Sequence, residues 1–113
     1  MYKREIKSMS KIIKTNEFID SVENKKGTVV VDFFATWCGP CKMLSPVYNS
    51  LGDEMKESAE FLKVDIDQSM ELAQRFIVTT VPTVVIFKDG KEMDRLVGFI
   101  PKNSLKAKVE EYL

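Results

Sequence analysis

Apolar positions along this 113-residue chain follow two spacings, one typical of buried strands and one typical of helices. Residues 28–35, TVVVDFFA, are β-branched or aromatic on both faces, which predicts a central strand covered on both sides. Further strands are predicted at residues 11–14, 60–67, 84–88 and 92–97. The last two flank Asp89-Gly90, a dipeptide typical of a hairpin turn.

Helical spacing predicts four helices between and after these strands. The first begins at Thr15 or Asn16, either of which can cap it, and ends at Gly27. The others follow the two cysteines, start at Ser69 and occupy residues 102–113. Their buried faces are expected to hold Phe18, Ile19, Val22, Leu44, Val47, Tyr48, Leu51, Met55, Leu72, Ala73, Phe76, Leu105, Val109 and Tyr112. This order predicts an α/β fold, in which helices cover both faces of a mixed sheet.

The length and composition fit one globular domain without repeats or linkers. Lysine plus arginine equals aspartate plus glutamate at 17 each, so the formal net charge is zero. That balance gives no bulk electrostatic reason to bind nucleic acid or an anionic membrane. We expect a flexible, locally basic leader over residues 1–9, one domain over residues 10–113, and a monomer.

No stretch approaches the ~18 consecutive apolar residues of a membrane helix. The N-terminus also lacks the apolar core of a secretory signal. The expected location is therefore cytoplasmic, where reducing conditions remove most structural disulfides.

The only two cysteines, Cys38 and Cys41, lie in WCGPCK at the start of a predicted helix. A zinc site needs about four nitrogen or sulfur ligands, and two thiols without any histidine would serve only if two subunits shared the metal. A structural crosslink is disfavoured because closing so short a loop removes little chain entropy. A dithiol that opens and closes as redox chemistry is the favoured interpretation.

The two thiols are expected to differ. Cys38 should lie near the unpaired N–H groups of the helix, which stabilise a thiolate, whereas Cys41 should be more enclosed and attack from within. A charge or side-chain donor between the cysteines would stabilise the reduced form and so make the disulfide more oxidising. Gly39 and Pro40 supply neither. We therefore expect a reducing pair.

Two segments, VVVDFFATWCGPCKMLSP and VPTVVIFKDGK, resemble the active-site segment and a downstream loop and hairpin of the thioredoxin family. The similarity runs from about residue 10 to residue 113. It implies a thioredoxin fold with a five-stranded sheet. It also implies a general protein disulfide reductase and electron carrier that uses a reversible Cys38–Cys41 disulfide. The implied partners are client proteins with exposed disulfides and a flavin-dependent thioredoxin reductase that draws on NADPH, with no bound metal or cofactor.

Asp32 lies within an apolar strand, between Val30 and Phe34 on the same face. Burial of an isolated carboxylate is costly, so its pKa should rise unless a partner compensates. The resemblance implies that Asp32 is the buried carboxylate that helps take the proton from Cys41. Lys63 matches the lysine beside this aspartate in the family, whereas the sequence alone favours a surface lysine.

The resemblance also implies a cis peptide bond between Val81 and Pro82, although most X-Pro bonds are trans. The Val81 backbone would then pair with an extended client segment. An apolar collar around Cys38 is implied, made of Trp37, Gly39, Pro40, Val81, Val97 and Gly98. Without the resemblance, Trp37 and Val97 would be expected in the core, and Gly98 would simply end a strand.

Two positions depart from familiar members and leave the client preference open. Phe34 stands where many members carry tryptophan, and Phe99 is larger than the small residue usual beside the glycine at 98. One alternative function is a reductase dedicated to a single client pathway, which Phe99 and the leader would favour. Another is a binding module whose collar clamps a partner without electron transfer.

Overall fold

The computed structural model describes residues 9–113, and the expected leader over residues 1–9 lies outside the described residues except for Met9. The elements follow in chain order as β1 (Lys11–Ile12), the 3₁₀ turn η1 (Thr15–Glu17), the π-helical turn η2 (Ile19–Glu23), β2 (Thr28–Phe34), α1 (Gly39–Glu54), β3 (Ala59–Asp65), α2 (Met70–Arg75), β4 (Thr83–Lys88), β5 (Lys91–Val97) and α3 (Lys102–Glu110). Within this described part, no helix is long and apolar enough to cross a membrane.

The five strands form one mixed sheet in the order β1-β3-β2-β4-β5. Strands β1, β3 and β2 are parallel, while β4 runs antiparallel to β2 and β5 antiparallel to β4. The predicted central strand is confirmed, because β2 lies in the middle of the sheet and its apolar side chains are buried on both faces. The predicted hairpin is confirmed as well: Asp89 and Gly90 both have positive φ, as a tight two-residue hairpin turn requires.

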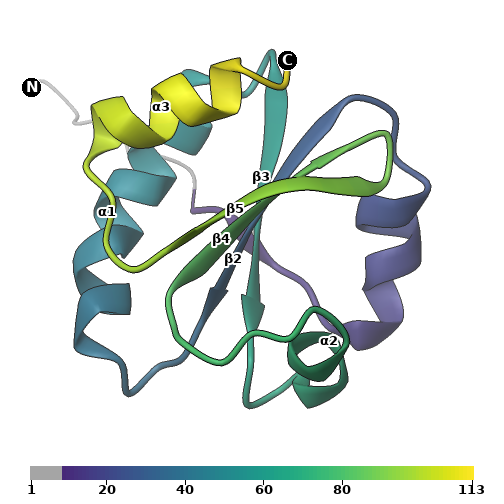
Figure 1. Ribbon diagram of the computed structural model, residues 1–113, viewed down its shortest axis with the longest axis vertical. Coiled ribbons are helices and arrows are strands. Elements are labelled where there is room, and N and C mark those ends of the chain that lie inside the picture. The colour runs from purple at the N-terminus through teal and green to yellow at the C-terminus, as the bar shows by residue number, and fades with distance from the viewer. Residues whose placement is uncertain (1–8) are drawn as a thin grey trace, which may run out of the picture.

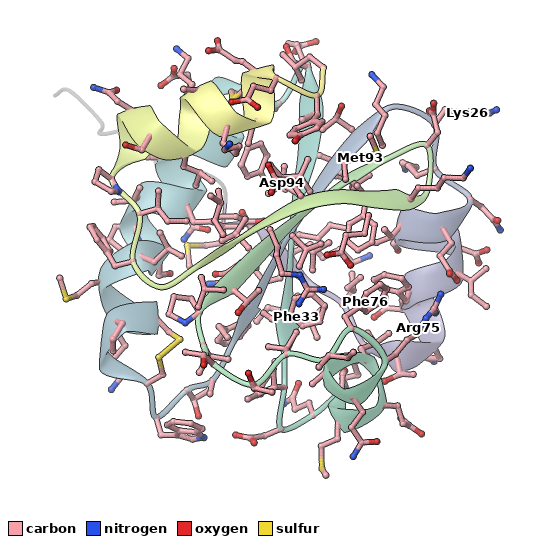
Figure 2. All side chains as sticks on the ribbon, viewed as in Figure 1. Lys26, Phe33, Arg75, Phe76, Met93 and Asp94 are labelled. Carbon is pink, nitrogen blue, oxygen red and sulfur yellow. A yellow bond between two sulfur atoms is a disulfide. The ribbon has the colours of Figure 1, made fainter. Side chains whose placement is uncertain are left out.

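Helices cover both faces of the sheet, with α1 and α3 on one side and η2 and α2 on the other (Figure 1). Alternation along β2 divides the core between these sides. Val30 packs with the residues of α1 and α3, whereas Val31 and Phe33 pack with those of η2 and α2. On the second side the rings of Phe33 and Phe76 are 6.1 Å apart between centroids (Figure 2).

The first predicted helix is not an α-helix but two consecutive turns, η1 and η2. Phe18 and Val22 are buried as expected, but Ile19 is 57% exposed and does not belong to the buried face. The i→i+3 and i→i+5 hydrogen bonds of such turns change the angle between successive side chains, so a 3.6-residue period misplaces one of them. In contrast, α1 continues through the exposed Pro46 without a break.

Candidate active site

Both cysteines lie where β2 ends and α1 begins, and they form a disulfide with Cα atoms 5.3 Å apart. Cys38 is the N-cap of α1 in an extended conformation, and its Sγ accepts a hydrogen bond from the backbone N–H of Cys41 at 3.1 Å. This donor and the positive end of the α1 dipole both stabilise negative charge on Cys38 Sγ when the bond is open.

The expectation that Cys41 is the more enclosed thiol is wrong for the disulfide state. Cys38 is 4% exposed and Cys41 is 5% exposed. The bond holds Cys38 Sγ against the first turn of α1, so the two residues are enclosed together. Any difference in reactivity must come from electrostatics and direction of approach rather than from overall exposure.

Asp32 and Lys63 are direct neighbours in the register of β2 and β3, and both are buried, at 1% and 8% exposed. The surface position that the sequence alone favours for Lys63 is therefore wrong. Lys63 Nζ lies 3.3 Å from Ser45 Oγ of α1 and 4.7 Å from the centroid of the Phe34 ring. Strand pairing fixes Lys63 beside Asp32, and a long-range contact with α1 covers it, so local sequence could not reveal its burial.

Neither carboxylate oxygen of Asp32 has a hydrogen-bond partner among the described residues. Burial raises the pKa of Asp32 to about 7, and the Lys63 ammonium only partly opposes that rise. By alternation along β2, Asp32 lies on the same face of the sheet as Val30, which packs with α1 and α3. Desolvation raises the pKa of Tyr48 on α1, and the Asp32 charge raises it further. A carboxyl group with this pKa can accept and release a proton near neutral pH.

The peptide bond between Val81 and Pro82 is cis, as the family resemblance implies. Cys38 Sγ lies 3.6 Å from the Val81 carbonyl oxygen, and the Gly98 N–H donates to the Pro82 carbonyl at 2.8 Å. The structure therefore brings Cys38 together with this loop and the end of β5, both of which lie more than 40 residues further along the chain.

The remaining collar positions are at the surface. Trp37 is 67% exposed and Val97 is 59% exposed, so the core positions expected without the resemblance are wrong. Gly39 and Pro40 are also exposed, in the first turn of α1. Gly98 has a φ of +92°, a conformation that side-chain-bearing residues rarely adopt, so it does more than end a strand.

Two residues of the site were missed by sequence reasoning. Asp67 accepts a 2.8 Å hydrogen bond from Trp37 Nε1, and Ser45 contacts the Lys63 ammonium. Asp67 lies 30 residues from its partner and outside both segments that resemble the family, whereas Ser45 lies within the first segment but carries no feature that singles it out. Among residues 9–113, no group of three or more cysteine, aspartate or glutamate side chains could hold a metal ion.

A mixed five-stranded sheet with a cysteine pair at a helix N-terminus, facing a cis-proline loop, defines the class of dithiol–disulfide oxidoreductases with this fold. The thioredoxin family model matches residues 9–111, and the chain belongs to that family. It is 42% identical over 98 residues to the thioredoxin of Staphylococcus saprophyticus, covering 87% of this chain and 92% of that one. It is 46% identical over 97 residues to the thioredoxin of Chlamydia trachomatis, covering 86% and 92%.

The crystal structure of Malassezia sympodialis thioredoxin superposes with a TM-score of 0.84 at 32% identity, covering 99% of this chain and 98% of that one. The fold class predicted from the sequence is confirmed. With its redox-active cysteine pair, this family member is a protein disulfide oxidoreductase with a general disulfide reductase role.

Proposed function

We propose that the Cys38 thiolate is the nucleophile and that Cys41 completes the exchange. Cys38 Sγ bonds to one sulfur of a client disulfide, and the other client sulfur leaves as a thiolate. Cys41 Sγ then attacks Cys38 Sγ, which closes the Cys38–Cys41 disulfide and expels the second client sulfur. The hydrogen bond from the Cys41 N–H to Cys38 Sγ is the observation that carries this assignment, because it stabilises charge on Cys38.

Asp32 is the proposed acceptor of the Cys41 proton, and Lys63 is the group that adjusts the pKa of Asp32. The support is an unpartnered buried carboxyl group with a pKa of about 7, on the face of the sheet that α1 covers. The Lys63 ammonium stabilises the ionised carboxylate and so limits the rise in the Asp32 pKa.

The collar (Trp37, Gly39, Pro40, Val81, Val97 and Gly98) together with the adjoining Pro82 is the proposed client-binding surface. Trp37 and Val97 expose apolar surface, and the Val81 carbonyl lies 3.6 Å from Cys38 Sγ. An extended client segment paired with the Val81 backbone would therefore bring its disulfide to the attacking sulfur.

The oxidised protein needs an external source of electrons. We assign this to a flavin-dependent thioredoxin reductase that draws on NADPH, with no metal or cofactor bound by the chain itself. This cycle belongs in the reducing cytoplasm, and one monomeric domain over residues 10–113 is sufficient for it.

Single cysteine variants test these assignments. With a disulfide-containing protein such as insulin as the client, Cys41→Ser should accumulate a mixed disulfide and Cys38→Ser should form none. Accumulation in Cys38→Ser instead would reverse the roles. The double variant separates reductase from binding module, since a clamp would retain its partner without either thiol.

The direction of the chemistry is tested by titrating the disulfide against thiol buffers, with Trp37 fluorescence as the signal. We expect a reduction potential below the glutathione poise of about −220 to −260 mV. A potential near −120 mV, typical of a strong oxidant, would contradict the proposed reductase and its cytoplasmic place.

Phe99, which is 42% exposed, is the feature that favours a dedicated client, and Phe99→Ala should then change the rate with that client alone.

A further inference from the structure

The Lys63 ammonium has its contacts on α1 and β2 but not on the Asp32 carboxylate. Lys63 Nζ lies 3.3 Å from Ser45 Oγ and 4.7 Å from the centroid of the Phe34 ring. A hydroxyl oxygen accepts a hydrogen bond from an ammonium, and an aromatic face within about 6 Å attracts a cation. Neither carboxylate oxygen of Asp32 has a hydrogen-bond partner among the described residues. The ammonium is thus bound by two neutral groups, while a buried carboxylate on the adjacent strand is left without a partner.

Lys63 is within reach of Asp32, because the two residues are partners in the register of β2 and β3. Neighbouring strands lie about 4.8 Å apart, a distance that a lysine side chain can span, and paired residues project from the same face of the sheet. Phe34, Ser45 and Lys63 also line one cavity of about 210 Å³, so the ammonium has room to move. Its position is therefore decided by the contacts that it makes rather than by tight packing around it.

The other groups around Asp32 leave Lys63 as the charge that acts on it. Val84, its partner on β4, is apolar, and α3 contributes apolar side chains to this side of the sheet. Tyr48 of α1 is hydrogen-bonded to two backbone carbonyls, and burial raises its pKa, so it remains neutral near pH 7. Cys41 does not titrate in the oxidised protein, because it is in the disulfide.

We infer that Ser45, with the Phe34 ring beside it, holds the Lys63 ammonium away from Asp32 and so prevents the salt bridge that the strand register allows. Ser45 is a positioning residue, since it acts on Asp32 through Lys63. A direct salt bridge would favour the ionised carboxylate and make it a weaker base. The catalytic consequence rests on the proposed function, in which Asp32 takes the Cys41 proton. Holding the ammonium at a distance keeps Asp32 able to bind a proton near neutral pH.

The primary test is the titration of Asp32 in the oxidised protein, followed by the NMR chemical shift of its carboxyl carbon. Ser45→Ala removes the hydroxyl and lets the ammonium turn toward Asp32, so the pKa of Asp32 should fall by about 1. Ser45→Thr keeps a hydroxyl and should keep the wild-type pKa. An Asp32 pKa that is unchanged or raised in Ser45→Ala would overturn the inference, and so would an equal fall in Ser45→Thr.

A matched control lies further along α1. Ser50 Oγ accepts a hydrogen bond from Lys102 Nζ of α3 at 3.2 Å, so Ser50→Ala removes the same kind of contact from another lysine. This variant should leave the pKa of Asp32 unchanged. A fall equal to that in Ser45→Ala would show a general effect of α1 and overturn the inference.

A double variant tests whether Ser45 acts through the ammonium. Lys63→Gln should raise the pKa of Asp32, because the carboxylate loses the positive charge that opposes the rise. Adding Ser45→Ala to Lys63→Gln should then change that pKa by less than about 0.3, since no ammonium remains to be positioned. A fall of about 1 in the double variant would mean that Ser45 acts on Asp32 directly, which contradicts the inference.

The pH profile of client release separates this inference from the proposed function. In a single turnover of the reduced protein with insulin, the acidic limb of the release rate should move to lower pH in Ser45→Ala, by the same amount as the Asp32 pKa. A fall in the pKa without movement of the profile would support the positioning role of Ser45 and count against Asp32 as the proton acceptor. Movement of the profile without a fall in the pKa would overturn the inference.

Discussion

Trp37 Nε1 donates a 2.8 Å hydrogen bond to Asp67 Oδ2, although the tryptophan side chain is 67% exposed. An exposed indole without such a contact would sample several rotamers. The bond therefore orients an apolar surface beside the cysteine pair before any client binds, which lowers the entropy lost on binding.

Asp67→Ala should weaken client turnover by freeing Trp37. We expect kcat/KM for a protein disulfide to fall about two- to fivefold, the effect of losing one solvent-accessible hydrogen bond. Asp67→Asn is the matched control, because its amide oxygen can still accept from the indole, and it should retain most of the activity. Equal losses in the two variants would show that the charge of Asp67 matters rather than the orientation of Trp37.

Asp32 should make the stability of the oxidised protein fall as the pH rises. Its pKa is 3.8 in the unfolded chain and about 7 in the folded protein, so the fold binds the proton more tightly between these values. Ionisation in the folded state then costs up to about 4 kcal/mol above pH 7. Asp32→Asn should raise the free energy of urea unfolding at pH 8 and change it little at pH 4.

Asp20→Asn, at an exposed position, is the matched control and should show no such pH dependence. The same Asp32→Asn variant should resolve a mixed disulfide more slowly, since Cys41 would lose its proton acceptor. A stability gain that is equal at pH 4 and pH 8 would refute the assigned pKa.

Ile77 carries backbone strain that a substitution should relieve. It has a φ of +53°, a left-handed conformation that β-branched residues rarely adopt, and it is 75% exposed. It follows the last turn of α2, where helices commonly place glycine or asparagine. Ile77→Asn should therefore raise the free energy of unfolding by about 1 kcal/mol. Ile19→Asn, at an exposed isoleucine without positive φ, should give no gain, and a gain at both sites would point to a general surface effect.

Gly90 and Gly27 form a matched pair that separates backbone conformation from steric contact. Their φ angles are +83° and +84°, but a Cβ at Gly90 would overlap the Glu23 carbonyl, whereas nothing lies within 4 Å of a Cβ at Gly27. Gly27→Ala and Gly90→Ala should each lower the free energy of unfolding by about 1 kcal/mol, because alanine disfavours the left-handed conformation. Gly90→Ala should lower the free energy of unfolding by about 1–3 kcal/mol more than Gly27→Ala, because the backbone of η2 must shift. Thermal unfolding of the two variants measures this difference, and equal losses would place the cost in conformation alone.

The sequence by itself determined those features that depend on local pattern. The β-branched run of β2 could be placed in the middle of a sheet because both of its faces are apolar. The Asp89-Gly90 turn could be placed because few dipeptides adopt two positive φ angles. The redox interpretation of Cys38 and Cys41 needed only their spacing, the absence of other ligands and the start of a helix.

The tertiary structure alone decided which side chains those elements cover. Lys63 is buried because β2 and α1 enclose it, and the exposed indole of Trp37 donates a hydrogen bond to Asp67, 30 residues away. Alternation along a strand assigns a side chain to a face, but it does not specify what packs against that face. The burial of Lys63 and the pKa of Asp32 both arise from contacts between distant segments, and local propensity carries no information about those contacts.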